Sequence, residues 1–186
     1  TRNMQNELIP QAPQMPSPAA SIAPLLSTRY RNSEDMHGIW DQPKKVTVQQ
    51  VTAAKSFCRE VETLYPPAPL EQLKDQLAGL LAHYYVSATD PKIVTVVAHH
   101  WLEIIKPLPG KFVWDAILKW LARPGGVKPR PGDIRQIAIE LFGEVAWDKY
   151  QRARIIGDMT PTFTQQADEK TKDEPWKPPT DEQKAN

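Results

Sequence analysis

The sequence predicts an all-α protein, a compact bundle of five or six helices with flexible, disordered arms at both ends. Apolar residues recur at spacings of three and four through residues 44–156, which is the spacing of one helix face. No stretch alternates apolar and polar residues as a half-buried strand does. The flanks show neither period. We therefore divide the chain into a proline-rich arm (1–43), a helical domain (44–156) and an acidic tail (157–186).

The first two helices are predicted over residues 47–64 and 69–86. Thr47 places a side-chain oxygen at the start of the first helix, where it can accept from a free backbone N–H. The proline pair at 66–67 ends that helix, because proline cannot continue one. Pro69 then opens the second helix, in whose first turn a missing N–H costs nothing.

The third and fourth helices are predicted over residues 91–106 and 111–122. Pro91 suits the first position of the third helix. Pro107 and Pro109 separate it from the fourth, because neither can stand inside a helix.

A turn with strong sequence signals separates the fourth helix from the fifth. The fourth ends at residues 124–126, a proline followed by two glycines that tolerate positive φ. Pro131 opens the fifth helix, and Asp133 places a carboxylate near the positive end of its dipole. Gly143 either ends this helix or only weakens it, since the apolar pattern continues towards Ile156.

The predicted core takes positions from the apolar stripe of each helix. It comprises Phe57, Val61, Leu77, Leu81, Val97, Trp101, Ile117, Leu121, Ile137 and Leu141. A domain of this length is large enough to bury such a core by itself.

The charges of the chain are unevenly distributed. Residues 44–156 hold sixteen basic and eleven acidic side chains, whereas residues 157–186 hold four and seven. A basic body with an acidic end permits contact with phosphate without requiring it.

Cysteine usage and hydropathy bear on where the protein works. Cys58 has no second cysteine to pair with, which fits a reducing compartment, and beside Phe57 it is expected to be a buried, inert thiol. No apolar run approaches the ~20 residues that span a bilayer, and the first residues do not form a secretion signal. We expect a cytoplasmic protein without membrane contact.

The residues that carry catalytic or metal chemistry do not occur in the necessary patterns. His99 and His100 are adjacent, so on a helix they point about 100° apart and cannot share a metal. No serine or cysteine stands in a strained nucleophile turn. Gly125 and Gly126 precede no phosphate-loop lysine. We therefore expect no enzyme and assign no catalytic, cofactor-binding or metal-binding residue.

Basic residues gather around the turn between the fourth and fifth helices. Lys128, Arg130 and Arg135 are the candidates for binding nucleic acid, since such clusters neutralise phosphates. No base-reading signature accompanies them, so this contact would be independent of sequence. The alternative is that these cations are solvated helix ends, paired with acidic neighbours such as Asp133.

Two isolated tryptophans are candidates for binding a protein partner. Trp40 lies in a polar arm, and Trp176 lies between Pro175 and Lys177 in the acidic tail, a context typical of short linear binding motifs. Two other interpretations stay open: Trp40 docks on the helices of its own chain, and Trp176 has no role.

A run of segments resembles a known family. These are HHWLEIIKPLP, then FVWDAILKWL, then KPRPGDIR at Lys128 to Arg135. Together, over about residues 47–142, they resemble small phage replication proteins of the helicase loader/inhibitor type. That family pairs an all-helical domain with a flexible C-terminal region that engages a hexameric replicative helicase. The resemblance implies a phage or prophage origin, a bacterial host cell, and a replicative helicase or another phage or host protein as partner.

The chain also departs from that pattern, with its proline-rich N-terminal arm and its acidic tail. Two functions therefore stand beside each other. The first is a non-enzymatic adaptor in DNA replication that contacts a helicase. The second is a virion or assembly protein, such as a scaffold, packaging or ejection component, whose arms order on assembly. An inhibitor of a host enzyme is a third, and the sequence does not indicate an oligomeric state.

Overall fold

The structure is a computed structural model that describes residues 13–29, 38–84 and 91–162. These residues form helices and no strand, apart from two isolated bridges, which confirms the all-α class. In chain order the elements are η1 (Ala23–Leu26), α1 (Val48–Leu64), α2 (Leu70–Ala82), α3 (Pro91–Ile105), α4 (Gly110–Leu121), α5 (Pro131–Phe142) and α6 (Glu144–Gly157).

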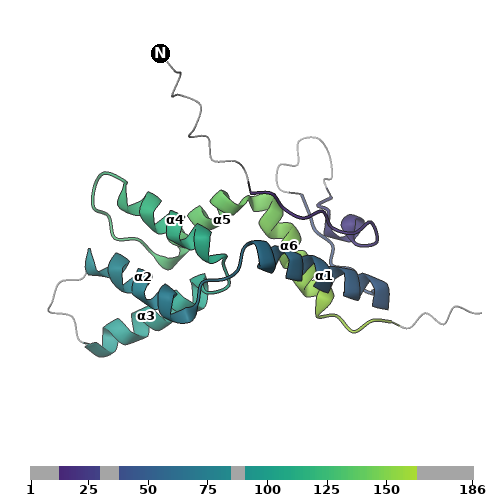
Figure 1. Cartoon of the computed structure of the whole chain (residues 1–186), viewed down its shortest axis with the longest axis horizontal. Coiled ribbons are helices and arrows are strands. Elements are labelled where there is room, and N and C mark those ends of the chain that lie inside the picture. Colours follow the sequence, from purple (N-terminus) through teal and green to yellow (C-terminus); the bar gives the residue numbers. More distant parts are fainter. Residues whose placement is uncertain (1–12, 30–37, 85–90, 163–186) are drawn as a thin grey trace, which may run out of the picture.

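The helices pack in two groups that lie end to end (Figure 1). One group is a four-helix unit, in which α4 packs on α5, α5 on α3, α3 on α2, and α2 on α4. In the other group α1 lies along α6, and η1 packs against α6. The contact of α5 with α6 joins the two groups. The first and last α-helices of the described residues are therefore partners, and the four between them form a unit of their own.

The predicted starts of the first and fifth helices are confirmed by their hydrogen bonds. Thr47 Oγ1 accepts from the backbone N–H of Gln50 at 3.2 Å, and Gln50 Oε1 accepts from the N–H of Thr47 at 2.9 Å. Asp133 Oδ2 likewise accepts from the N–H of Arg130 at 2.7 Å, ahead of α5. Gly143 settles the open question at the other end of α5. It has φ +104°, so it ends α5, and α6 begins at the next residue.

The second helix ends earlier than residue 86. α2 stops at Ala82, and the N–H groups of His83 and Tyr84 turn back to the carbonyls of Leu80 and Leu81. These hydrogen bonds join residues three positions apart, as in a 3-10 turn, and they end the helix. Residues 85 and 86 lie outside the described part of the chain.

An aromatic cluster joins the two groups of helices. The ring of Phe142, at the end of α5, lies 5.3 Å from Phe112 of α4, 5.6 Å from Tyr65 after α1, and 6.0 Å from Trp147 of α6. All three contacts are close to edge-to-face, the arrangement that aromatic quadrupoles favour. Tyr150 extends the cluster along α6, 5.6 Å from Trp147. Side chains from four parts of the chain thus meet at one point.

A second junction is formed by backbone alone. The linker after α1 and the linker before α4 meet in an isolated bridge between Pro67 and Pro109. The N–H of Gly110 donates to the carbonyl of Pro66 at 2.9 Å. A Cβ at Gly110 would lie 2.7 Å from the backbone nitrogen of Ala68, so only glycine fits without movement.

Part of the segment assigned to the N-terminal arm lies against the helices. Ile22 and Leu26, at either end of η1, are completely buried. The Tyr65 hydroxyl donates to the carbonyl of Gln14 at 3.1 Å. Residues 13–29 therefore contribute to the core. Residues 1–12 and 30–37 of the arm and residues 163–186 of the tail lie outside the described residues, so their predicted flexibility stays a prediction.

Seven of the ten predicted core residues are buried, namely Phe57, Val61, Leu77, Leu81, Trp101, Ile117 and Ile137. Val97 and Leu141 are half-buried and pack against the core. The prediction for Leu121 is wrong, because its side chain is 36% exposed. It lies at the end of α4, on the side of the helix that faces solvent.

Trp101→Ala should destabilise the fold by about 3–5 kcal/mol, because it empties a large aromatic site that is 2% exposed. Trp114→Ala is the matched control: this residue is 42% exposed, so the loss should stay below about 1 kcal/mol. Urea denaturation measures both. Equal losses would contradict the packing described here.

Gly110→Ala should destabilise the chain by about 1–3 kcal/mol, since the new methyl group collides with the backbone at Ala68. Gly79→Ala, inside α2 with open space around it, should instead stabilise by about 0.5–1 kcal/mol, because alanine favours the helix. Thermal unfolding of the two variants should give shifts of opposite sign. A neutral Gly110→Ala would mean that the two linkers do not meet.

Candidate functional site

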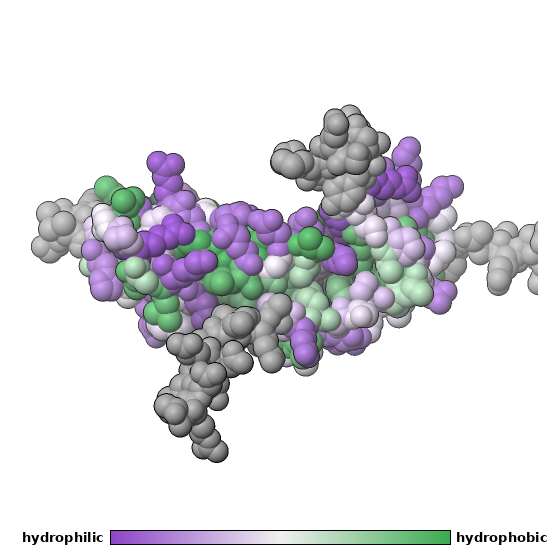
Figure 2. All heavy atoms as spheres, turned by 90° about the horizontal axis from the view of Figure 1, so that it is seen from above, coloured by the Kyte–Doolittle hydropathy of each residue, from purple (hydrophilic) through white to green (hydrophobic). Residues whose placement is uncertain are grey.

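The outer face of α4 carries an exposed apolar stripe, formed by Trp114, Leu118 and Leu121. Their exposed fractions are 42%, 45% and 36%. Spacings of four and three place them on one side of the helix. Figure 2 shows apolar surface, in green, interrupting the polar surface at the end of the molecule that holds the four-helix unit. Large apolar side chains gathered at the surface in this way are typical of interaction sites.

The stripe is exposed because α4 has more apolar residues than its neighbours can cover. Its buried side carries Phe112, Val113, Ala116 and Ile117, and packs against α2 and α5. The sequence interpretation placed Leu121 in the core with Ile117 and did not predict Trp114 or Leu118 as surface residues, so it missed this stripe. The signal was present in GKFVWDAILKWL, whose apolar residues cover more than one helix face.

A groove lies beside Trp114, between α4 and the linker that precedes α2. Its volume is about 490 Å³, and its lining includes Pro66, Pro67, Pro69, Gln76, Lys111 and Trp114. Gln76 Oε1 is buried and has no hydrogen-bond partner within the described residues. A buried acceptor without a donor is unfavourable, so this side chain would gain by turning its oxygen towards a donor in the groove.

The loop between α4 and α5 is held by contacts within itself, although all of its residues except Pro129 are exposed. Trp120 Nε1 donates to the carbonyl of Val127 at 3.1 Å, which closes the loop on itself. The guanidinium of Arg123 lies 4.5 Å from the Trp120 ring centre, a cation–π contact. Gly125 and Gly126 have φ of +109° and +60°, which permits the sharp turn.

The three candidate phosphate-binding residues all lie at this loop or just after it. Lys128, Arg130 and Arg135 are exposed. Within the described residues neither arginine forms an ion pair, and the carboxylate of Asp133 accepts instead from the backbone N–H of Arg130. The alternative that the cations pair with acidic neighbours therefore does not hold for Arg130 and Arg135. Whether the cluster binds nucleic acid stays a prediction.

Trp40 contacts its own chain. Its Nε1 donates to the carbonyl of Leu25 at 2.8 Å, and the guanidinium of Arg152 lies 5.5 Å from its ring centre. Arg152 also donates to the carbonyl of Leu26 at 2.7 Å and to Thr28 Oγ1 at 2.8 Å. Trp40 thus helps to hold η1 on α6, the alternative that the sequence had left open. Trp176, the other candidate, lies outside the described residues.

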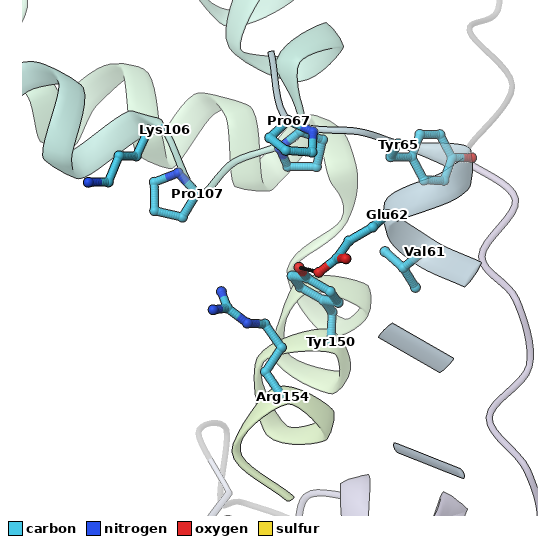
Figure 3. A pocket seen from close by; sticks show the side chains of 9 residues that line it. Val61, Glu62, Tyr65, Pro67, Lys106, Pro107, Tyr150 and Arg154 are labelled. Carbon is cyan, nitrogen blue, oxygen red and sulfur yellow. Dashed lines mark hydrogen bonds between the residues drawn. The ribbon is translucent and has the colours of Figure 1, made fainter. Parts of the chain in front are cut away.

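A hollow of about 250 Å³ lies where the two groups of helices meet (Figure 3). The Tyr150 hydroxyl donates to Glu62 Oε1 at 2.7 Å, and this bond ties α6 to α1. Burial, followed by this hydrogen bond, raises the pKa of Tyr150 above its usual range. Lys106 Nζ, at the rim, pairs with Glu103 at 2.6 Å. Because its pKa is raised, the phenol of Tyr150 stays protonated and cannot serve as a base at neutral pH.

Cys58 is buried between α1 and α6, with its Sγ 4.0 Å from the carbonyl oxygen of Tyr150. Burial raises the pKa of this thiol to about 11, so the reactive thiolate is not formed at neutral pH. In the described part of the chain no group of three or more potential ligands is placed to hold a metal. Among the described helices, none combines the length and apolarity that crossing a bilayer requires.

Comparison of the chain with protein-family models, with curated proteins and with solved structures gives no match. The function therefore has to be inferred from the surface of the molecule.

If the loop binds phosphates, replacing Lys128, Arg130 and Arg135 with glutamine should weaken binding to duplex DNA. The slope of log affinity against log salt should fall by up to about 2.7, since three phosphate contacts are lost. Fluorescence anisotropy at several salt concentrations measures this slope.

The control replaces Lys44, Lys45 and Lys55 with glutamine, which removes the same charge at exposed positions in and before α1. An equal change in slope in both triple variants would show that net charge acts, and not the loop.

Proposed function

We propose that this chain is a non-enzymatic adaptor that binds another protein through the outer face of α4. The observation that carries this proposal is the exposed stripe of Trp114, Leu118 and Leu121. Anchors at such spacing suit a helix that packs against an apolar groove or helix of a partner. Tryptophan contributes strongly to binding where an interface buries it, because it offers a large, rigid apolar surface.

The charges beside the stripe favour an acidic partner. Lys111 and Lys119 are exposed on α4, and Arg123 follows its C-terminal end. A second copy of the chain is a poorer fit, because antiparallel pairing of two α4 helices would bring the cations of each end together. Such repulsion works against association of two copies, whereas the same cations attract a partner with a negatively charged surface.

The process is suggested by the family resemblance of residues 47–142. On this proposal the adaptor acts in phage or prophage DNA replication, and its partner is a replicative helicase. The tail around Trp176 is a second contact with the helicase. Lys128, Arg130 and Arg135 add contact with DNA that is independent of sequence. The resemblance supports these assignments, and the contacts that close the cationic loop on itself are compatible with them.

Leu118→Glu should reduce capture of the helicase by at least about tenfold, because a charge in a buried apolar contact costs more than about 1.4 kcal/mol. Its control is Val145→Glu, a change of the same kind at a residue of α6 that is 70% exposed. Affinity purification from infected or lysogenic cells, with quantitative mass spectrometry, measures both.

The result identifies which proposal fails. A helicase captured equally by wild type and Leu118→Glu would remove α4 from the interface. Enrichment of a capsid or packaging protein in place of a helicase would favour the assembly function.

A further inference from the structure

We propose that the groove beside Trp114 holds a segment of the chain's own tail, Glu174–Pro179 (EPWKPP), while no partner is bound. This inference concerns the free protein and goes beyond the adaptor function. It rests on the chemistry of the groove, on an unsatisfied acceptor within it, and on where the described chain ends.

The groove has the lining that proline-rich segments recognise. Pro66, Pro67 and Pro69 form one side, and Trp114 lies beside them. Proline-rich segments hold an extended conformation before they bind, and they dock in apolar grooves with aromatic walls, a part that Trp114 can play here. The tail segment offers three prolines around one tryptophan. The volume of about 490 Å³ is sufficient for a few of these side chains.

The polar groups of the groove complement the same segment. Gln76 Oε1 is buried without a donor, and the indole N–H of Trp176 is a donor that needs an acceptor when it is buried. Lys111 is exposed at the rim, and Glu174 directly precedes the Pro-Trp pair. A rotation of the Gln76 side chain would bring its Oε1 to the surface of the groove, where one hydrogen bond and one ion pair would fix the orientation of the segment.

The tail can reach the groove from its last described residue. The N–H of Thr162 donates to the carbonyl of Val46 at 2.9 Å, which places the root of the tail just ahead of α1. α1 has 17 residues and is about 26 Å long, and the groove begins at Pro66, just beyond its far end. The roughly 14 residues from Thr162 to Trp176 extend to about 46 Å. The tether is therefore longer than the helix it must pass.

Nuclear magnetic resonance of the full chain, labelled with nitrogen-15, tests the proposal without any partner. Trp176→Phe identifies the indole N–H signal of Trp176. In the wild type this signal and the backbone N–H signals of Glu174, Trp176 and Lys177 should differ in position from those of a synthetic peptide of residues 163–186. Trp114→Ala should move them to the peptide positions, because one side of the groove is lost.

Leu121→Ala is the matched control, a change on the exposed face of the same helix outside the groove lining, and it should leave the tail signals where they are in the wild type. Circular dichroism confirms that each variant is folded.

Three results would overturn the proposal. Tail signals that coincide in the wild type and the peptide would show that no segment docks. Shifted signals that Trp114→Ala leaves unchanged would place the segment elsewhere. Shifts that vanish on dilution would assign the groove to the tail of a second copy. None of these results bears on capture of a helicase through α4, so the two proposals fail independently.

Discussion

The edge-to-face packing around Phe142 is the contact on which the arrangement of the whole chain depends. Phe142 closes α5, and its ring meets Phe112 of α4, Tyr65 after α1 and Trp147 of α6. Apart from the bridge between the two proline linkers, this cluster is where the α1–α6 pair meets the four-helix unit. The glycine that follows Phe142 has φ +104°, which ends α5 and lets α6 begin at the next residue. A side chain with a Cβ at position 143 would strain that turn and shift the aromatic contacts.

The division into two groups also explains why α4 keeps an apolar face towards solvent. In a four-helix unit each helix has two neighbours and a diagonal, and α4 packs against α2 and α5. The α1–α6 pair, which would cover another face in a single six-helix bundle, instead lies at the end of the unit (Figure 1). Trp114, Leu118 and Leu121 therefore remain uncovered within the described residues.

Local signals in the sequence were sufficient to predict where helices begin, but not how the helices pack against one another. Thr47, Pro131 and Asp133 predict helix starts because a cap needs only residues a few positions away. The stripe of α4 could not be assigned to core or surface in this way, since that depends on which helices pack beside it. The self-contact of Trp40 depends likewise on Leu25 and on Arg152, far away in the chain. The cations at 128–135 could be predicted because they lie close together in the sequence. The groove beside Trp114 could not, because residues 66–76 and 110–114 line it together and neither segment signals it alone.

The pairing of α1 with α6 has a consequence for synthesis of the protein. Glu62 and Tyr150, which bond across this pair, are 88 residues apart. On a ribosome that adds about 5–20 residues per second, α1 therefore waits roughly 4–18 s for its partner. During that time the four-helix unit can close by contacts between neighbours, while Phe57 and Val61 of α1 have no α6 to cover them. The newly made chain therefore exposes the apolar face of α1 until α6 emerges, and a chaperone that binds apolar helices would find its target there.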